Sequence, residues 1–297
     1  MRVLLVLPFV LAGGVAHAQP AKITIGIYAP SVEFGAATAR LAYVKALGNA
    51  IAQNTGLVVE AQSYATLAAL KKDNVDFAII DGPCYATNLG WRLLASANIG
   101  GGTQRAWALY AGGGGDMQAL RGKKLAYIAS GCNDAGFVDN AMFDSEVDAT
   151  FFGARIGKPD LTGAVAEVVS TRTADAVFAP AGAAKGLTKV IDTGPVPNPA
   201  FVDLGSKLPA GTVDKVAAAV IGYGGGGAIS GWARPARDIY TAFAGRMNRV
   251  VKNGVLANPD PVRIDAKDVL QEPSTLRDTA VIDVRHHFVR PPGDRLD

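Results

Sequence analysis

Few residues in this chain could carry out covalent catalysis. Its three histidines are His17, His286 and His287, and its two cysteines are Cys84 and Cys132. A cysteine nucleophile needs a base within hydrogen-bonding reach, and no sequence pattern places the paired histidines beside either cysteine. The sequence also lacks the spacings typical of zinc sites, phosphate-binding loops and nucleophile elbows. We therefore expect a protein that is not an enzyme and that uses no metal and no cofactor.

Ligand binding is better supported, because polar and aromatic residues follow several predicted strands. Residues 75–80 are mostly apolar and β-favouring, and the turn Asp81–Pro83 then ends this strand and begins a helix through Tyr85. Ligands of open α/β sheets bind beyond the carboxyl ends of the strands, so we interpret this turn as one wall of a binding cleft. The candidate ligand-binding residues are Tyr28, Ser31, Glu33, Tyr64, Asp81, Cys84, Tyr85, Ser130, Cys132, Asn133, Asp134 and Phe178.

Each of these assignments has a purely structural alternative. The turn after residue 80 also fits an ordinary connection between a strand and a helix. The acidic candidates could cap helices or face solvent. For each aromatic candidate, and for Phe137, burial in the core is the more common outcome.

The elements around these residues alternate between strand and helix, which predicts a parallel α/β architecture. Predicted strands cover residues 22–28, 57–61, 75–80, 94–97, 107–110, 125–129, 164–170, 175–179, 190–193 and 201–204. Predicted helices cover residues 32–55, 65–72, 137–152 and 239–251, with a further amphipathic helix after residue 209. The glycine run at 111–115 is a plausible hinge, after which the pattern restarts.

The N-terminus is typical of an export signal. A positive residue, Arg2, precedes an apolar stretch at 3–10, and Ala16–Ala18 fits a small-x-small cleavage site, so we expect residues 1–18 to be removed. No cysteine follows that site, so we expect no lipid anchor. A buried N-terminal strand is the alternative. The formal net charge is +3 with scattered lysines and arginines, which argues against nucleic acid or an anionic membrane as partner.

The order of elements resembles type 2 periplasmic solute-binding proteins, in particular the phosphate/phosphite/phosphonate-binding (PhnD-like) family of ABC transport systems. The resemblance is carried by ITIGIYAP at 23–30, NVDFAIIDGPCYA at 74–86, RGKKLAYIASG at 121–131 and, most specifically, VIDTGPVPNPAFVDLGSKLPAGTVDKVAAAV at 190–220. It implies a two-lobed α/β protein with a mixed, mostly parallel sheet in each lobe. Lobe 1 would comprise residues 19–113 and 194–297, including a C-terminal extension, and lobe 2 residues 114–193. The resemblance further implies a periplasmic monomer that closes on a small-molecule or lipid ligand and delivers it to an inner-membrane transporter.

The ligand implied by the resemblance does not fit the predicted cleft loops. Phosphonate binders hold the anion with a Ser-Thr-Ser-Gly type turn, whereas this chain has Ser130–Asp134 at that place. With Asp81 and Glu33, the loops contain three acids and no lysine or arginine. One carboxylate at ~4 Å from a phosphonate costs about 4 kcal/mol at an effective dielectric constant of 20. We therefore expect a neutral amphipathic lipid, with a sterol as the best example, and keep a phosphonate- or phosphate-type oxyanion as the alternative.

The two cysteines occupy equivalent places in the two lobes of this arrangement. Closing the lobes could bring Cys84 and Cys132 within the ~4.4–6.8 Å between Cα atoms that a disulfide needs, and such a bond would lock the protein closed. We favour the alternative, in which they remain separate and pack as small apolar side chains.

Overall fold

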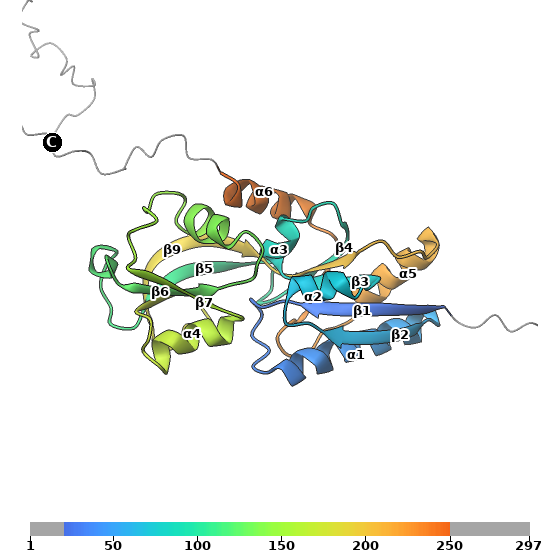
Figure 1. The fold of residues 1–297 in the computed structure, drawn as a ribbon. Coiled ribbons are helices and arrows are strands. Elements are labelled where there is room, and N and C mark those ends of the chain that lie inside the picture. The colour runs from blue at the N-terminus through green and yellow to red at the C-terminus, as the bar shows by residue number, and fades with distance from the viewer. Residues whose placement is uncertain (1–20, 250–297) are drawn as a thin grey trace, which may run out of the picture. The chain divides into compact units, whose positions relative to one another are not determined.

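The computed structural model describes residues 21–249, whose strands form two mixed sheets (Figure 1). The first sheet has the order β11-β4-β10-β3-β1-β2. Its strands are β1 (Lys22–Tyr28), β2 (Val58–Ser63), β3 (Phe77–Ile80), β4 (Arg92–Asn98), β10 (Ala200–Asp203) and β11 (Gly231–Ala233). The strand β1 is parallel to both β2 and β3, whereas β10 is antiparallel to β3 and β4.

The second sheet has the order β7-β6-β8-β5-β9. Its strands are β5 (Gln104–Ala111), β6 (Lys124–Ile128), β7 (Ala154–Lys158), β8 (Ala176–Pro180) and β9 (Thr188–Pro197). The helices are α1 (Ala37–Thr55), α2 (Leu67–Lys72), α3 (Gly82–Ala86), α4 (Leu161–Val169), α5 (Ala210–Ile221) and α6 (Arg237–Met247), with a 3-10 turn η1 (Gln118–Leu120) and a π-helix η2 (Gly136–Met142). This arrangement confirms the predicted two-lobed α/β fold with a mixed sheet in each lobe. The expectation of mostly parallel sheets was wrong, because five of the nine strand pairings in the described chain are antiparallel.

The strand β5 belongs to the second lobe, which corrects the predicted lobe boundary. We expected the first crossing near residue 113, in the glycine run after this strand. Instead β5 pairs with β8 and β9, so the chain leaves the first sheet before Gln104. It returns after Pro197, close to the predicted position of 194. Because residues 112–115 follow a strand within the second sheet, they do not form a connection between the lobes.

Alternating side chains of the first sheet pack against helices on both of its faces. Ile25 and Phe77 lie in one apolar cluster with α1 and α5, whereas Tyr28 and Ile80 lie in a second cluster with α2, α3 and α6. A third cluster joins the second sheet to η2, α4 and part of α6. Both faces of β1 and β3 are therefore covered, which explains why these strands are almost continuously apolar.

Three predicted elements differ from the structure. The first helix begins at Ala37 rather than residue 32, because Gly35 adopts a positive φ of 75°. The predicted helix over 137–152 ends at Met142, followed by residues in the left-handed region at 144 and 145. The predicted strand over 164–170 is the helix α4, whose N-cap Asp160 accepts a hydrogen bond from Gly163 N at 2.8 Å. The valines of this segment favour a strand when they are considered alone. The capping residue Asp160, which precedes the predicted strand, favours a helix.

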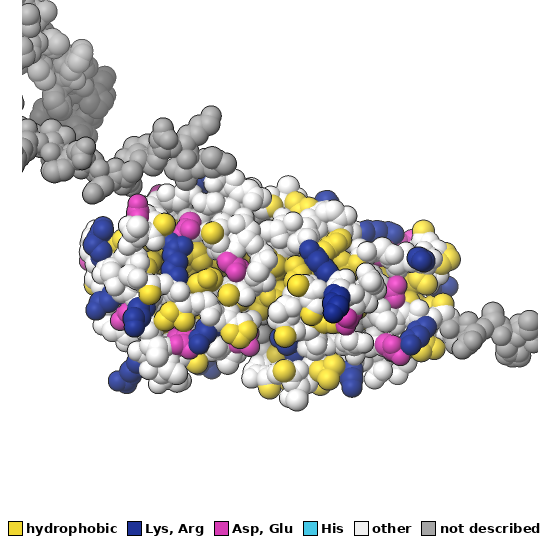
Figure 2. Space-filling view, viewed as in Figure 1, with side chains coloured by type: hydrophobic (Ala, Val, Ile, Leu, Met, Phe, Trp, Pro, Cys, Tyr) yellow, Lys and Arg dark blue, Asp and Glu magenta, His cyan; other side chains and the backbone are white. Residues whose placement is uncertain are grey.

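The chain after residue 221 contributes to the fold as far as it is described. The strand β11 pairs with the edge of β4, and α6 matches most of the helix predicted over 239–251. The predicted leader at 1–18 and the remainder of the predicted extension lie outside the described residues. Within 21–249, no helix combines the length and apolar character needed to cross a bilayer. On the face drawn in Figure 2, basic and acidic side chains are interspersed rather than grouped by sign.

Candidate functional site

The two lobes meet where β1 and β3 of the first sheet and β6 of the second have their carboxyl ends. The Tyr28 hydroxyl at the end of β1 donates to Ser130 O beyond β6 at 2.8 Å. Leu161 N, at the start of α4, donates to Pro30 O at 2.9 Å. In the first sheet β1 lies between β2 and β3, so its connections diverge at this end, which is where open α/β sheets place ligands. We refer to this region as the junction.

A buried polar cluster forms the centre of the junction. Asp81 is 2% exposed, and its carboxylate accepts a hydrogen bond from Ser31 Oγ. Arg105, at the start of β5, donates from Nη2 to Ser31 O at 3.1 Å and from Nε to Asn198 Oδ1 at 2.9 Å. Burial raises the pKa of Asp81 to about 6, opposed by the Ser31 hydrogen bond and the Arg105 guanidinium. Every member of this cluster is therefore held by protein groups.

The predicted cleft loops contain no basic residue of their own, but Arg105 of the strand β5 lies against the loop that contains Ser31. Burial lowers the pKa of this guanidinium, while the carboxylates of Asp81 and Glu33 raise it. The sequence did not indicate Arg105, because this residue precedes the strand predicted over 107–110, which was assigned to lobe 1. Its one sequence signal is a charged residue at the start of an otherwise apolar strand.

The loop after β6 uses its carboxylate to stabilise its own turn. Asp134 Oδ1 accepts hydrogen bonds from Ser130 N at 3.0 Å, from Ser130 Oγ at 2.7 Å and from Gly131 N at 3.1 Å. Asn133 has a positive φ of 60°, and its Oδ1 accepts from Gly136 N at 3.1 Å. Of the three predicted cleft acids, Asp81 and Asp134 are thus engaged within the protein, and Glu33 is exposed. The repulsion that we expected toward an anion is correspondingly weaker.

A disulfide bond joins Cys84 to Cys132, in place of the separate thiols that we favoured. The two Cα atoms are 5.0 Å apart, and 48 positions separate the residues in the chain. Cys84 is the third residue of α3 and Cys132 follows β6, so the bond links the two lobes. Both cysteines are buried in the cluster that contains Tyr28 and Tyr85. The sequence could not settle this pairing because it depends on how closely the lobes approach.

Three of the predicted aromatic ligand contacts are buried within apolar clusters, and their contact with a ligand stays a prediction. Tyr85 is fully buried, its ring packs edge-on against Tyr240 with centroids 4.8 Å apart, and its hydroxyl donates to Trp91 O at 3.3 Å. Phe178 lies inside the second lobe, 4.9 Å from the ring centroid of Phe143. Tyr64 is 6% exposed and belongs to the same apolar cluster as Tyr85. These rings support the lobes.

A cavity of about 60 Å³ remains at the junction. Phe34 and Arg40 line it from the first lobe, and Asp160 and Thr162 line it from the second. Arg40 Nε donates to Ser63 Oγ at 2.7 Å. The N-cap of α1, Ala36, has no side chain that accepts a hydrogen bond, so the first N–H groups of this 19-residue helix are available to a ligand.

The helix α6 is a further tie between the lobes, because it contacts α3 on one side and η2 on the other (Figure 1). Tyr240 donates to Asn198 O at 3.0 Å, and Arg237 Nη2 donates to Leu89 O at 2.6 Å. Toward the second lobe, Arg246 Nη2 donates to Thr193 O at 2.7 Å, and Asn140 Nδ2 donates to Met247 O at 2.8 Å. The junction is thus held by loop hydrogen bonds, a disulfide and this helix.

Comparison with known proteins returns no matching family model and no matching curated sequence. Solved structures do match. PhnD1 from Prochlorococcus marinus in complex with methylphosphonate has a TM-score of 0.58 at 11% identity, covering 77% of this chain and 98% of its own. The binding-protein component of an ABC phosphonate transporter from Pseudomonas aeruginosa has 0.57 at 13% identity, covering 73% and 82%. A Xanthomonas citri protein bound to ATP has 0.57 at 12% identity, covering 79% and 99%. At these identities the likeness shows only that this chain shares the fold of these three proteins.

Proposed function

We propose that this chain is the periplasmic solute-binding component of a transport system and takes a small ligand at the junction. The observation that carries the proposal is the meeting of strand ends from both sheets, marked by the hydrogen bond from Tyr28 to Ser130 O. Two structural neighbours support it, one named as the binding protein component of an ABC phosphonate transporter and the other determined in complex with methylphosphonate. An inner-membrane transporter is the corresponding partner, and the protein acts as a monomer without catalytic activity.

The size of the junction favours a small solute over the sterol that we expected. A cavity of about 60 Å³ corresponds to roughly two water molecules in liquid volume, whereas drug-sized ligands occupy about 300–1,000 Å³. A sterol would enter only if the lobes separated. The junction also has polar groups suited to a small ligand, namely Arg40 and the uncapped N-terminus of α1. We therefore propose a compact polar solute for the arrangement of lobes seen in the structure.

The charge of that solute follows from the balance around Arg40. Arg40 faces the cavity together with one carboxylate, Asp160, which is already the N-cap acceptor of α4. An oxyanion therefore meets one guanidinium and one helix N-terminus, both favourable, against one engaged carboxylate. This arrangement supports the oxyanion alternative through Arg40 and the N-terminus of α1, while a neutral solute remains compatible with the polar lining.

The disulfide affects how any junction ligand enters and leaves. Binding proteins of this kind work by moving their lobes about the crossings, and a bond between Cys84 and Cys132 ties the lobes on the cleft side of those crossings. We infer that the oxidised protein exchanges a junction ligand more slowly than the reduced protein does.

A thermal-shift panel tests the ligand. Methylphosphonate, inorganic phosphate, a detergent-solubilised sterol and neutral small solutes are added to the wild type and to Arg40→Gln. Because a ligand that binds only the native state raises stability by mass action, the true ligand should raise the melting temperature by several degrees. Arg40→Gln should abolish a shift caused by an oxyanion, and Lys45→Gln on the same helix serves as the matched control.

Each outcome of the panel decides between the hypotheses. A shift with methylphosphonate or phosphate that Arg40→Gln removes supports an oxyanion at the junction. A shift with a neutral solute that survives Arg40→Gln supports neutral binding. A shift with the sterol alone contradicts the small-solute proposal, and an oxyanion shift that Arg40→Gln leaves intact contradicts the assigned location.

A further inference from the structure

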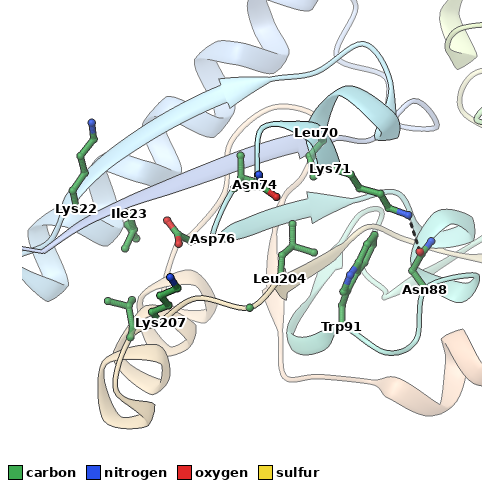
Figure 3. Close-up of a pocket in the computed structure, with 13 residues that line it drawn as sticks. Lys22, Ile23, Leu70, Lys71, Asn74, Asp76, Asn88, Trp91, Leu204 and Lys207 are labelled. Atoms are coloured by element: carbon green, nitrogen blue, oxygen red, sulfur yellow. Dashed lines mark hydrogen bonds between the residues drawn. The ribbon is translucent and has the colours of Figure 1, made fainter.

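A groove of about 880 Å³ lies at the other end of the first sheet, away from the junction (Figure 3). Lys22 and Ile23 at the start of β1 line it, as do the residues 74–76 that lead into β3. Tyr28 and Asp81, which form the junction, are at the opposite ends of these two strands. The volume falls within the range of about 300–1,000 Å³ that small-molecule pockets occupy.

Part of the groove's lining is apolar and includes an aromatic ring. Leu70 and Val75 are buried core residues that reach its surface, and Leu204 and Trp91 are partly buried beside them. The Lys71 ammonium lies 5.0 Å from the centroid of the Trp91 ring. A half-buried indole with an apolar surround favours a flat apolar group, since aromatic surfaces contribute beyond the area that they bury.

The charge around this apolar lining is positive. Three lysines line the groove, and Figure 3 shows Lys22 and Lys207 toward one end and Lys71 toward the other. Lys22 pairs with Glu60 at 2.7 Å, but within residues 21–249 no carboxylate lies within ion-pair distance of Lys71 or Lys207. Two of the three cations are therefore available to an incoming anion.

The single carboxylate in the lining is already engaged. Asp76 Oδ2 accepts hydrogen bonds from Thr24 N at 2.8 Å and from Thr24 Oγ1 at 3.1 Å. The Thr24 hydroxyl oxygen in turn accepts a hydrogen bond from Asp76 N at 3.0 Å. These bonds fix the carboxylate against the start of β1, and they weaken its opposition to an anion elsewhere in the groove.

The segments that carry the lysines are held in place before any ligand arrives. Asp203 Oδ1 accepts from Gly205 N at 2.9 Å and from Ser206 N at 2.7 Å, which forms the turn that leads to Lys207. Leu204 N donates to Asp76 O at 2.9 Å and joins this turn to β3. On the other side, Lys71 Nζ donates to Asn88 Oδ1 at 3.0 Å. A preformed arrangement reduces the entropy that binding would otherwise cost.

We propose that this groove is a second ligand site, separate from the junction, for an aromatic organic anion such as an aryl carboxylate or sulfonate. The aromatic body packs on Trp91 and Leu204, and the acidic group forms a charge-assisted hydrogen bond with Lys71 or Lys207. Charge complementarity favours this class over a neutral aromatic, and the size of the groove favours a small molecule over an extended surface. The proposal is independent of what the junction binds.

The test uses the fluorescent probe anilinonaphthalene sulfonate and its uncharged relative phenylnaphthylamine, each titrated into the full chain under native conditions. We expect one saturable site for the sulfonate. The double variant Lys71→Gln/Lys207→Gln should weaken sulfonate binding about tenfold or more, since hydrogen bonds to charged groups are among the stronger ones. It should leave binding of the uncharged probe unchanged. The matched control is Lys45→Gln/Lys215→Gln, two exposed lysines that do not line the groove.

Three outcomes would overturn the proposal. The first is equal sulfonate affinity in the double variant and the control, which places the probe elsewhere. The second is equal binding of the charged and uncharged probes, which removes the role of the lysines. The third is displacement of the probe by a glutamate-rich peptide but not by benzenesulfonate, which indicates a protein partner. A Trp91→Leu variant with an unchanged urea midpoint and weakened sulfonate binding would support the assigned location.

Discussion

The two ends of β1 and β3 treat polar groups in opposite ways. At the carboxyl ends, Asp81 is buried and accepts a hydrogen bond from Ser31, and the disulfide between Cys84 and Cys132 joins the two lobes nearby. At the amino ends, Lys71 and Lys207 line an open groove and have no carboxylate partner within the described chain. The cavity at the junction has a volume of about 60 Å³, whereas the groove at the amino ends has a volume of about 880 Å³.

Charged groups therefore have different roles at the two ends of this sheet, stabilising the fold at one end and remaining available for binding at the other. A buried carboxylate with hydrogen-bond partners specifies one arrangement of the elements around it. The protein therefore loses stability when any of these partners is removed. Exposed ammonium groups contribute little to folding, because water already solvates them. Changes at the junction should therefore alter stability and lobe movement, whereas changes in the groove should alter binding alone.

The largest effect should come from removing the cross-link. A disulfide between residues 48 positions apart lowers the entropy of the unfolded chain. In the chain-entropy treatment this raises the free energy of unfolding by about 4 kcal/mol. The double variant Cys84→Ala/Cys132→Ala should lose about that much free energy of unfolding, measured by urea denaturation. Dithiothreitol should destabilise the wild type toward the same midpoint and leave the variant unaffected. Equal urea midpoints for the oxidised wild type and the variant would show that the disulfide does not stabilise the folded protein.

The next effect is a pH dependence that belongs to Asp81. The pKa of Asp81 is about 6 in the folded protein and about 3.8 in the unfolded chain, so the folded state binds the proton more tightly. The resulting stabilisation is present in full below pH ~4 and is lost as the pH rises through ~6, a change of about 3 kcal/mol. Wild-type stability should fall by that amount relative to Asp81→Asn between pH 3 and pH 7. Parallel pH profiles for the two proteins would count against a raised pKa.

A smaller effect is expected for Tyr28→Phe. This change removes the hydroxyl that donates to Ser130 O across the junction, at a cost of about 1 kcal/mol. The amide of Leu161, which donates to Pro30 O, should then exchange with solvent about fivefold faster if the lobes part locally. Tyr127→Phe in β6 is the control, because no hydrogen bond is formed by that hydroxyl within the described chain. Identical exchange in both variants would show that the contact does not hold the lobes.

The smallest effect should be that of Lys71→Gln/Lys207→Gln on folding. Both side chains are exposed at the groove, so the free energy of unfolding should change by less than about 0.5 kcal/mol. Urea denaturation checks this beside the wild type. A loss of more than about 1 kcal/mol would mean that the groove lysines support the fold, and the comparison between the two ends would no longer hold.

Local patterns in the sequence were sufficient for most of the strands but not for the junction, and they did not predict β7 and β11. The strand at 22–28 and the turn at 81–83 follow from alternating or continuous apolar residues and from a proline at a helix start. Arg105 and the pairing of Cys84 with Cys132 depend on how two sheets approach each other, which no local pattern encodes. Nor does a local pattern decide the place of Phe178, because an aromatic residue near a strand end looks the same whether it faces a cleft or a core.

The groove was missed for a related reason. The candidate residues were inferred from the carboxyl ends of predicted strands, where parallel sheets usually place ligands. The residues that line the groove are instead at strand beginnings and in the turn after the antiparallel strand β10. Lys71 and Lys207 are 136 positions apart by their numbering, so only the folded sheet brings their two segments to one groove.

The position of β10 also determines when the first lobe can be completed as the chain emerges from its N-terminus. This strand inserts between β3 and β4, although it follows every strand of the second sheet along the chain. Until residues 200–203 arrive, β3 and β4 lack the neighbour that they share. Both cysteines emerge well before that point. The order of the chain therefore allows the covalent link between the lobes to form while the first sheet still has a gap at its centre.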